Sequence, residues 1–242
     1  MNKLKKIIKD RRVRKHFFAI FIAALILALS VYLFAEKEDN KMTKEKNEKV
    51  IALPAPREKG ALSLEECIRK RRSVRDFAPR KLAMDEVSQL LWSAQGITDE
   101  SRNFRAAPSA GALYPLEIYL VKEDGLFHYM PKGHKIEQLA EKDLRPALAQ
   151  AAYGQSSVAE ASADIVICAV YERVSAKYRE KGIRYTDMEA GHAAQNLHLQ
   201  AVSLGLASVP IGAFAEEAAA KILSLPRDCK PIYIISIGEP KK

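Results

Sequence analysis

Three arginines and a serine stand close together in one short run of the sequence, Arg71-Arg72-Ser73-Val74-Arg75-Asp76-Phe77. The planar guanidinium group of arginine matches the geometry of a phosphate, which can accept two hydrogen bonds from it. If a helix ends here, Arg71 and Ser73 can face one anion, with Arg75 further along the same face. The run therefore indicates a phosphate site, although taken alone a solvated basic patch is the commoner explanation.

Two segments of small residues have the composition of ligand-binding loops. Pro108-Ser109-Ala110-Gly111-Ala112-Leu113-Tyr114-Pro115 has no charge and permits close approach of backbone to a ligand. In Val209-Pro210-Ile211-Gly212-Ala213-Phe214, proline removes one amide and stiffens the chain, so the following amides can point at a ligand. Either segment alone is equally typical of a connecting loop. Together with the arginine run they predict a site for an anionic, planar cofactor.

The N-terminal region has the pattern of a membrane anchor. Residues 17–35 carry no charge, and at about 1.5 Å per residue they span a hydrocarbon core of roughly 30 Å. Residues 1–15 have a net charge of +7, which predicts a cytoplasmic tail, a transmembrane signal anchor at 16–35, and an extracytoplasmic catalytic domain in a single-pass membrane protein. A cleaved signal peptide is the alternative, but its apolar core would be shorter.

The segment after the anchor is too polar to fold alone. Residues 36–50 contain five basic and five acidic side chains, so we interpret 36–60 as a stalk and 61–242 as the folded domain. The net charge after residue 50 is +2, which gives no indication of nucleic-acid binding. Cys67, Cys168 and Cys229 lack metal-binding spacing, and we expect core thiols and no metal.

The hydrophobic pattern predicts helices and strands without strict alternation, which is an α+β plan. Ser63 and Glu66 form a capping-box pattern at the start of a helix that leads into the arginine run. Asp124-Gly125 predicts a hairpin turn. The other expected elements are helices at 82–95, 184–204 and 216–223, short helices within 134–160, and strands at 116–123, 126–130, 165–171 and 231–238. The 184–204 helix is expected to bury a stripe that includes Met188.

Five motifs in order carry a resemblance to a known family. They are RRSVRDF, LLWSAQGIT, APSAGALYPLE, RYTDMEAGHAAQNLHLQAVSLGLASVPIGAF and YIISIGEP. Across residues 63–240 the sequence resembles the FMN-dependent nitroreductase superfamily, in particular its SagB/ThcOx-type dehydrogenase branch. The resemblance implies an α+β sandwich with a central mixed sheet flanked by helices. It also implies an obligate homodimer with two FMN sites at the interface.

The resemblance assigns roles to the three segments. It implies that the arginine run contacts the phosphate, ribityl chain and ring edge of FMN, that the first small-residue loop reaches the flavin of the other subunit, and that the second lies beside the flavin N5. The implied cofactor-binding residues are Arg71, Arg72, Ser73, Arg75, Pro108, Ser109, Ala110, Gly111, Pro210, Ile211 and Gly212. Many members add a basic residue after the last strand, where this chain has Lys241 and Lys242 at an end that we expect to fray.

The implied reaction is ping-pong electron or hydride transfer through FMN. NAD(P)H is the expected donor, and a nitroaromatic or quinone an expected acceptor. The alternatives are an azoline or peptide dehydrogenase like SagB, and a non-catalytic flavin-binding partner on the same scaffold. Tyr114, Tyr185 and His192 are candidate proton donors, although packing or surface exposure is the commoner explanation for each. Residues 128–160 and 172–184 carry no motif and are expected to determine substrate choice.

Overall fold

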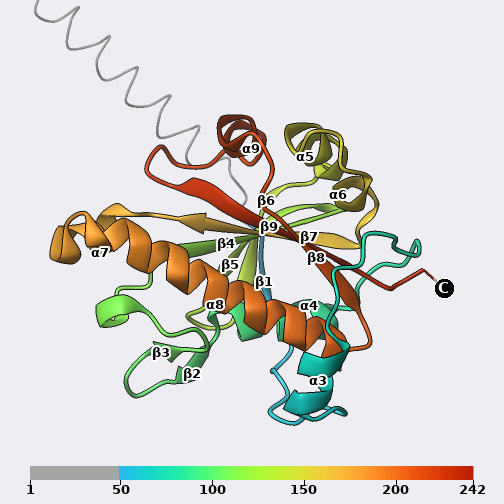
Figure 1. Cartoon of the computed structure of the whole chain (residues 1–242), viewed down its shortest axis with the longest axis horizontal. Helices are drawn as coiled ribbons and strands as arrows, with labels where there is room; N and C mark the ends of the chain where they lie inside the picture. The colour runs from blue at the N-terminus through green and yellow to red at the C-terminus, as the bar shows by residue number, and fades with distance from the viewer. Residues whose placement is uncertain (1–48, 242) are drawn as a thin grey trace, which may run out of the picture. The chain divides into compact units, whose positions relative to one another are not determined.

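The computed structural model describes residues 49–241 (Figure 1). The predicted cytoplasmic tail and transmembrane anchor, at 1–15 and 16–35, lie outside the described residues, as does most of the predicted stalk. Within 49–241, none of the helices combines the length and the apolar character needed to cross a membrane.

A seven-stranded sheet with the order β1-β6-β5-β4-β7-β9-β8 forms the centre of the domain. Its strands are β1 (Lys49–Ala52), β4 (Leu116–Lys122), β5 (Gly125–Met130), β6 (Lys135–Ala140), β7 (Ala163–Ala169), β8 (Ala207–Ile211) and β9 (Lys230–Gly238). A separate ribbon pairs β2 (Ile97–Asp99) with β3 (Phe104–Arg105).

The expectation of a mixed sheet is wrong for the described strands. Each strand runs antiparallel to its neighbours. Tight turns connect β4, β5 and β6, and between β8 and β9 the chain reverses direction, so each of these pairs is antiparallel. Among residues 49–241, the parallel contact is an isolated bridge between Ser73 and Ser208.

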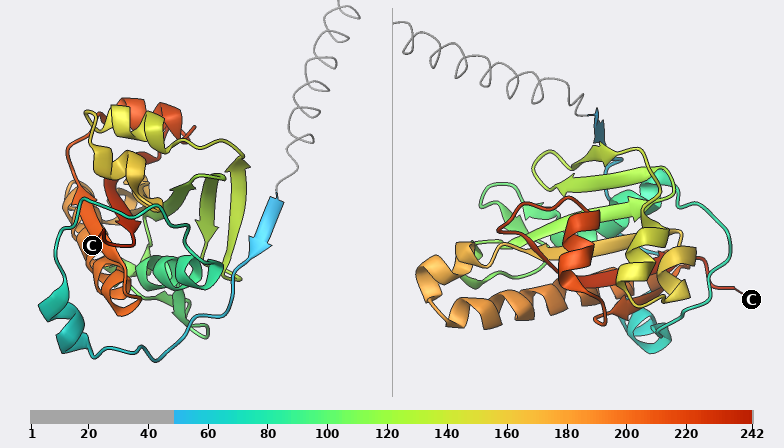
Figure 2. Two further views of the ribbon diagram at one scale, coloured as in Figure 1. Left: turned by 90° about the vertical axis from the view of Figure 1, so that its right-hand side faces the viewer. Right: turned by 90° about the horizontal axis from the view of Figure 1, so that it is seen from above.

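Helices cover both faces of the sheet, as Figure 2 shows. One hydrophobic cluster lies between the sheet and the pair α4 and α8, and a second lies under α5, α6 and α9. This is the α+β sandwich that the sequence predicted. The helices are α3 (Leu64–Lys70), α4 (Met84–Gln95), α5 (Arg145–Ala151), α6 (Ser156–Glu160), α7 (Glu172–Tyr178), α8 (Lys181–Ser203) and α9 (Glu216–Ile222), with a 3-10 turn at Ala110–Ala112.

Several local predictions are confirmed. Ser63 and Glu66 form the complete capping box at the start of α3. Residues 123–124 connect β4 to β5 as a hairpin. All seven residues of β7 are buried, as expected for a strand covered on both faces. The three cysteines are buried and free.

Other predictions are corrected by tertiary pairing. The segment 134–160 begins with strand β6, because pairing with β5 and β1 on its two sides outweighs its weak strand propensity. Residues 207–211, expected to be part of a loop, form the edge strand β8. Met188 is exposed, since α8 turns Glu189 and Ala190 toward the interior instead.

The sheet begins inside the segment predicted as a stalk. Lys49–Ala52 forms the edge strand β1, which pairs with β6. The next residue continues the contact, because the Leu53 amide donates to the His134 carbonyl at 3.0 Å. Four residues are enough here because β6 supplies a ready partner edge.

Candidate functional site

The arginine run leaves α3 and passes along the outer edge of β8. Arg71 is the C-terminal cap of α3. Beyond it, Ser73 forms the parallel bridge with Ser208, and the Val74 amide donates to the Ser208 carbonyl at 3.1 Å. Two of the three predicted segments, the arginine run and the Pro210 segment, are therefore adjacent within one chain.

The guanidinium groups of this run have uncompensated charge. Among residues 49–241, the side chains of Arg71, Arg72 and Arg75 form no ion pair, whereas the nearby Arg80 lies 2.8 Å from carboxylate oxygens of both Glu86 and Glu239. Arg72 differs from the other two because its Nη1 donates to the carbonyls of Arg69 and Arg71 at 3.1 and 2.7 Å. An anion held by Arg71 and Arg75 would balance their charge, so these residues fit the phosphate of FMN.

The end of β8 presents an open backbone beside these arginines. The Ser208 carbonyl points away from β9, beyond the edge of the sheet, toward Val74. Because backbone groups alternate along a strand, those of Pro210 point to the same side. Proline is tolerated there because its nitrogen has no ladder bond to make. Gly212 is exposed, and a Cβ added to it would meet no heavy atom within 4 Å. This space is compatible with a flat ligand beside Pro210, Ile211 and Gly212.

His198 of α8 lies beneath the arginine run. It is 5% exposed, and its Nδ1 lies 2.7 Å from the Ser208 hydroxyl oxygen. Burial, aided by the positive charge of Arg71, lowers the pKa of His198 to about 4. The imidazole is therefore neutral near pH 7. The sequence pattern gave no signal for this residue, because its partner Ser208 comes from another element.

The C-terminal residues fix the segment that follows the arginines. The Lys241 amide donates to the Asp76 carbonyl at 3.0 Å, and the Ala78 amide donates to the Glu239 carbonyl at 2.9 Å. Phe77 forms a bridge with Pro240 between these bonds. The terminus is therefore paired as far as Lys241, and the expectation of fraying there is wrong. Lys242 lies outside the described residues.

The loop from Pro108 to Gly111 belongs to a different part of the molecule. It follows β3 and continues into the 3-10 turn. Ser109 does not face outward, because its hydroxyl oxygen accepts a hydrogen bond from the Tyr114 amide at 2.9 Å. Pro108 and Gly111 are exposed and Ala110 is half-buried, so Pro108 and Gly111 form its outer surface.

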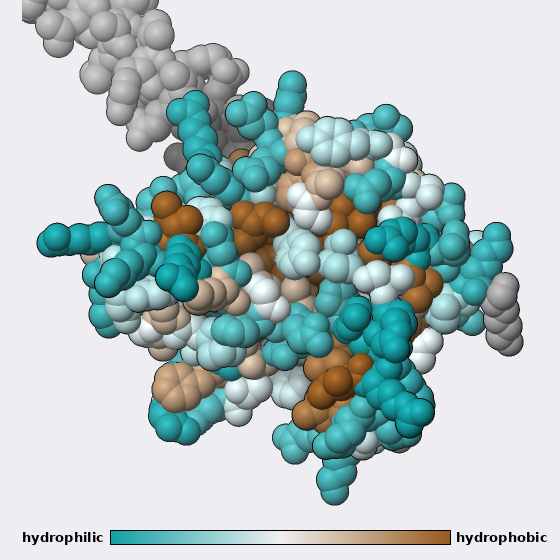
Figure 3. Space-filling view, viewed as in Figure 1, coloured by the Kyte–Doolittle hydropathy of each residue, from teal (hydrophilic) through white to brown (hydrophobic). Residues whose placement is uncertain are grey.

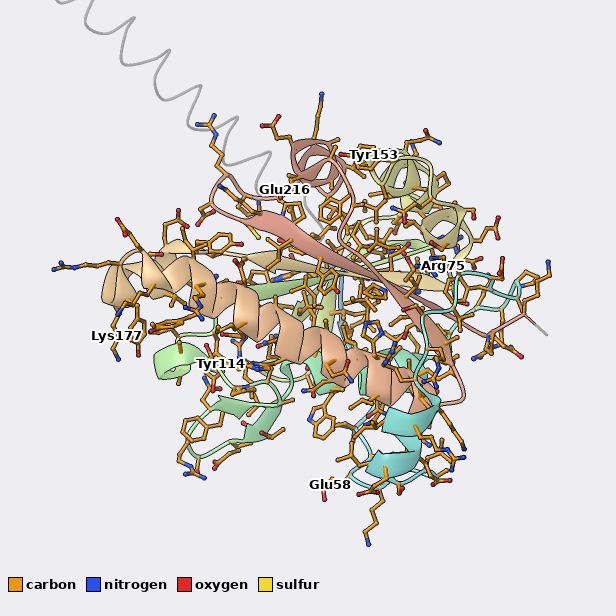
Figure 4. All side chains as sticks on the ribbon, in the orientation of Figure 1. Glu58, Arg75, Tyr114, Tyr153, Lys177 and Glu216 are labelled. Carbon is orange, nitrogen blue, oxygen red and sulfur yellow. The ribbon has the colours of Figure 1, made fainter. Side chains whose placement is uncertain are left out.

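The two parts of the predicted site lie apart within one chain. In Figure 4, Tyr114 lies on the same side as Lys177, near the first half of α8, and Arg75 lies near its C-terminal end. This helix has 23 residues, a length of about 34 Å. The structure therefore does not bring Pro108, Ser109, Ala110 and Gly111 to the arginines of the same chain. A two-fold pair of chains can bring one end of each copy to the other end of its partner.

A lysine and a tyrosine lie next to Gly111, in a segment where the sequence showed no motif. A Cβ added to Gly111 would lie 2.9 Å from the Tyr178 hydroxyl and 3.1 Å from the Lys177 Nζ. The predicted candidate Tyr185 packs against Tyr178 edge to face, with ring centroids 5.3 Å apart. The Lys177 ammonium and the Tyr178 hydroxyl therefore lie at the surface of this loop, where they could contact a bound ligand.

The remaining candidate proton donors have different surroundings. The Tyr114 hydroxyl accepts from the Arg105 amide at 3.2 Å and faces the interior. His192 is exposed on α8. Within residues 49–241, no three histidine, cysteine or acidic side chains form a cluster that could hold a metal ion.

The comparison that decides the family is a match of the nitroreductase family model to residues 68–239. The chain belongs to the nitroreductase family. It is 40% identical over 183 residues to "Putative nitroreductase MJ1384" of Methanocaldococcus jannaschii, covering 73% of this chain and 91% of that protein. The nitroreductase structure most useful for comparison is a "putative nitroreductase" from Ralstonia eutropha, with a TM-score of 0.74, 30% identity, and coverage of 81% of this chain and 92% of that one.

The nitroreductase chain is also similar to a peptide-processing protein. It is 27% identical over 171 residues to the microcin B17-processing protein McbC of Escherichia coli, covering 66% of this chain and 63% of McbC. This relative agrees with the SagB-type branch indicated by the sequence motifs.

Proposed function

We propose that the protein is an FMN-dependent oxidoreductase that works as a homodimer. In this proposal it takes electrons from NAD(P)H and passes them to a small organic acceptor such as a nitroaromatic or a quinone. The observation that carries the proposal is the pair of uncompensated guanidinium groups, Arg71 and Arg75, beside the open end of β8. Family membership supports the choice of FMN as the anion.

One chain would hold the phosphate end and one side of the ring of the cofactor, and the partner copy would cover the ring. Arg71, Ser73 and Arg75 would bind the phosphate and ribityl chain, and the backbone from Pro210 to Gly212 would lie beside the ring. The loop from Pro108 to Gly111 of the partner copy would cover the ring. When bound, FMN supplies hydride or electron transfer, and Lys177 and Tyr178 are placed to hold or deliver a proton beside Gly111.

Exposed apolar residues support a dimer. Leu64 and Ile68 of α3 are 60% and 56% exposed, and Figure 3 shows hydrophobic surface over α3 on the same face as α8. Ile183 and Met188 of α8 are also exposed. Exposed apolar surface, as over α3, is typical of an interface between chains.

The titration that tests the function uses the full-length protein, purified with FMN under anaerobic conditions. NADH and NADPH are added in separate experiments, and the flavin absorbance is followed. We expect bleaching by at least one of them and recovery of the absorbance when a nitroaromatic or quinone is added. Protein that takes up no FMN would contradict the proposal, and bound FMN that cannot be reduced and reoxidised would favour a non-catalytic flavin-binding partner.

A second candidate function is the oxidation of azoline rings in a peptide. It is favoured by the likeness to McbC. An azoline-containing peptide that reduces the oxidised flavin faster than NADH or NADPH does would select this function. Equal or slower reaction would select the small-molecule oxidoreductase.

We further propose that residues 16–35 anchor the protein in the cell membrane and that the folded domain is extracytoplasmic. The support is the uncharged segment and the basic residues that precede it. A reporter enzyme that is active only outside the cytoplasm, fused after residue 242, is expected to be active. Activity of a cytoplasmic reporter instead would reverse the topology.

A further inference from the structure

The loop that precedes β4 has a backbone conformation that its neighbours must hold. Ala112 and Tyr114 have φ values of +54° and +48°, in the left-handed region that alanine and tyrosine rarely adopt. Such a conformation persists only where surrounding contacts fix it. The contacts at Tyr114 therefore determine where the outer surface of this loop, at Pro108 and Gly111, is placed.

Contacts on the interior side fix the ring and the amide of Tyr114. The Arg105 guanidinium lies 4.5 Å from the centroid of the Tyr114 ring, and its Nη1 donates to the Gln95 Oε1 at 3.0 Å. The Gln95 Nε2 lies 3.4 Å from the Oε1 of Glu189, a buried residue of α8. The Tyr114 amide donates to the Ser109 hydroxyl oxygen at 2.9 Å. These contacts leave the Tyr114 carbonyl to be held from another side.

The connection between β7 and α7 holds the two carbonyls at the end of the loop. The Val170 amide donates to the Pro115 carbonyl at 2.9 Å. Three residues later, the Nη1 of Arg173 donates to the Tyr114 carbonyl at 3.1 Å. The first bond joins backbone groups and can form with most residue types, whereas the second requires the side chain at position 173.

A carboxylate of β4 orients Arg173. The Nη2 of Arg173 lies 2.5 Å from the Oε1 of Glu117, whose Oε2 lies 2.7 Å from the Nε2 of His128 on β5. The His128 ring packs against Tyr119, with centroids 4.9 Å apart. Burial alone would raise the pKa of Glu117, but hydrogen bonds from His128 and Arg173 outweigh it and lower that pKa, so the carboxylate is ionised near pH 7. The planar fork of Arg173 therefore bridges a fixed carboxylate and the Tyr114 carbonyl.

The exposure of this ion pair argues against a purely stabilising role. The side chain of Arg173 is 42% exposed and that of Glu117 is 21% exposed. Ion pairs with this much solvent contact add little to the free energy of unfolding. The geometric effect is larger, because the pair holds the carbonyl at which the left-handed residues of the loop end.

Helix α7 reaches the same loop at a second point. A Cβ added to Gly111 would lie 3.1 Å from the Lys177 Nζ. Residues four apart on a helix are neighbours on its surface, so Arg173 and Lys177 lie on one face of α7. The bond from Arg173 therefore fixes the loop relative to the helix that carries Lys177.

We propose that Arg173 is a positioning residue that holds the loop from Pro108 to Tyr114 against α7 by bridging the Tyr114 carbonyl and Glu117. Its effect on the reaction rests on the proposed function, in which this loop covers the flavin of the partner copy. Loss of the bridge leaves the loop attached through Pro115 and frees its outer surface to move. Arg173 acts through the loop and does not itself touch the flavin.

The test measures hydrogen–deuterium exchange of residues 108–115 in the full-length protein without added FMN. Arg173→Ala should lower the protection of this loop severalfold, whereas the protection of β7 should not change. Arg227→Ala is the matched control and should behave as the wild type, because Arg227 is also exposed but lies in the connection between α9 and β9. Wild-type protection of the loop in Arg173→Ala would overturn the proposal.

A second variant keeps the test valid if Arg173→Ala fails to fold. Glu117→Gln keeps an oxygen that can accept from Arg173 but removes the charge that orients it, and it should lower loop protection by a smaller factor. The double variant should match Arg173→Ala, because both residues act through one bridge. Unchanged loop protection in Glu117→Gln, or losses that add in the double variant, would count against the proposal.

A spectroscopic readout separates the position of the loop from the proposed function. In protein loaded with FMN, Arg173→Ala should increase the quenching of flavin fluorescence by iodide severalfold, because an uncovered ring meets the quencher more often. Arg227→Ala should leave the quenching unchanged. Faster loop exchange with unchanged quenching would contradict the proposed covering of the flavin and support the role of Arg173 in holding the loop. Failure of the wild type to bind FMN would contradict the proposed function, and the exchange result would still decide the role of Arg173.

Discussion

The two halves of α8 bury titratable groups of opposite character. Toward the C-terminal end, His198 lies under the arginine run, and burial keeps it neutral. Toward the N-terminal end, Glu189 lies under the loop from Pro108 to Gly111, and burial keeps its carboxyl partly protonated near neutral pH. One helix therefore supports a positive surface at one end and an uncharged loop at the other, and the proposed dimer needs both.

The two groups should also affect stability in opposite directions. His198 has a lowered pKa, so the unfolded chain binds more protons between about pH 4 and 6.5, and the stability contributed by this group falls as the pH falls through that range. Glu189 has a raised pKa, so the folded chain binds more protons between about pH 4.5 and 7, and its contribution falls as the pH rises.

The largest effect is expected when the two ends are damaged in different chains. One chain carries Arg71→Ala and Arg75→Ala, the other carries Gly111→Val, and the two are co-expressed with different tags and purified as a heterodimer. Each homodimer should be inactive. The heterodimer should regain about half the wild-type activity per dimer, because one composite site then has both wild-type parts. A heterodimer with no activity would mean that each site is built within one chain.

The next effect isolates the buried histidine. His198→Asn keeps a hydrogen-bonding side chain for Ser208 but does not titrate. Between pH 6.5 and pH 4 the wild type should lose about 3 kcal/mol of unfolding free energy more than the variant, as expected when burial lowers the pKa from 6.5 to about 4. Urea unfolding at a series of pH values measures the difference. If the unfolding free energies of the two proteins changed with pH in parallel, His198 would make no contribution to the pH dependence of stability.

A smaller effect is expected from one arginine. Arg71→Ala should weaken FMN binding by about 1.5–3 kcal/mol, the value of a charge-assisted hydrogen bond. Arg72→Ala is the matched control and should have a smaller effect, because the Arg72 guanidinium donates to backbone carbonyls of α3. Titration of the flavin fluorescence measures both. Equal losses would show that Arg72 also contacts the phosphate.

The smallest effect concerns the helix that presents the arginines. Ser63→Ala removes the capping hydroxyl of α3 and should lower stability by about 1 kcal/mol. FMN affinity should fall slightly. Hydrogen–deuterium exchange of the loop at residues 108–115 should not change, because α3 does not support that loop. A change in loop exchange would show that the two ends are coupled within one chain.

The sequence predicted the parts of the fold and site whose signals are local. The capping box before Arg71, the hairpin at Asp124 and the buried strand β7 all depend on near neighbours. The strand β8 was missed because its Pro210 is acceptable only at a sheet edge, which is a tertiary property.

Buried polar residues were harder to predict than exposed arginines. Glu189 and His198 are two of many polar residues in α8, and nothing near them in the sequence marks them as buried. Their hydrogen-bond partners come from other elements. Lys177 and Tyr178 likewise gain their place beside Gly111 through folding alone. Such residues become recognisable as functional only when their surroundings are known.

The pairing of residues 76–78 with residues 239–241 has a consequence for biosynthesis. The ribosome makes the arginine run long before residues 239–241, whose backbone fixes the segment that follows the run. Strand β9, which fills the place between β7 and β8, likewise follows both of its neighbours in the chain. The nascent chain therefore cannot complete its anion-binding segment, or capture a cofactor there, until residues 239–241 have emerged from the ribosome.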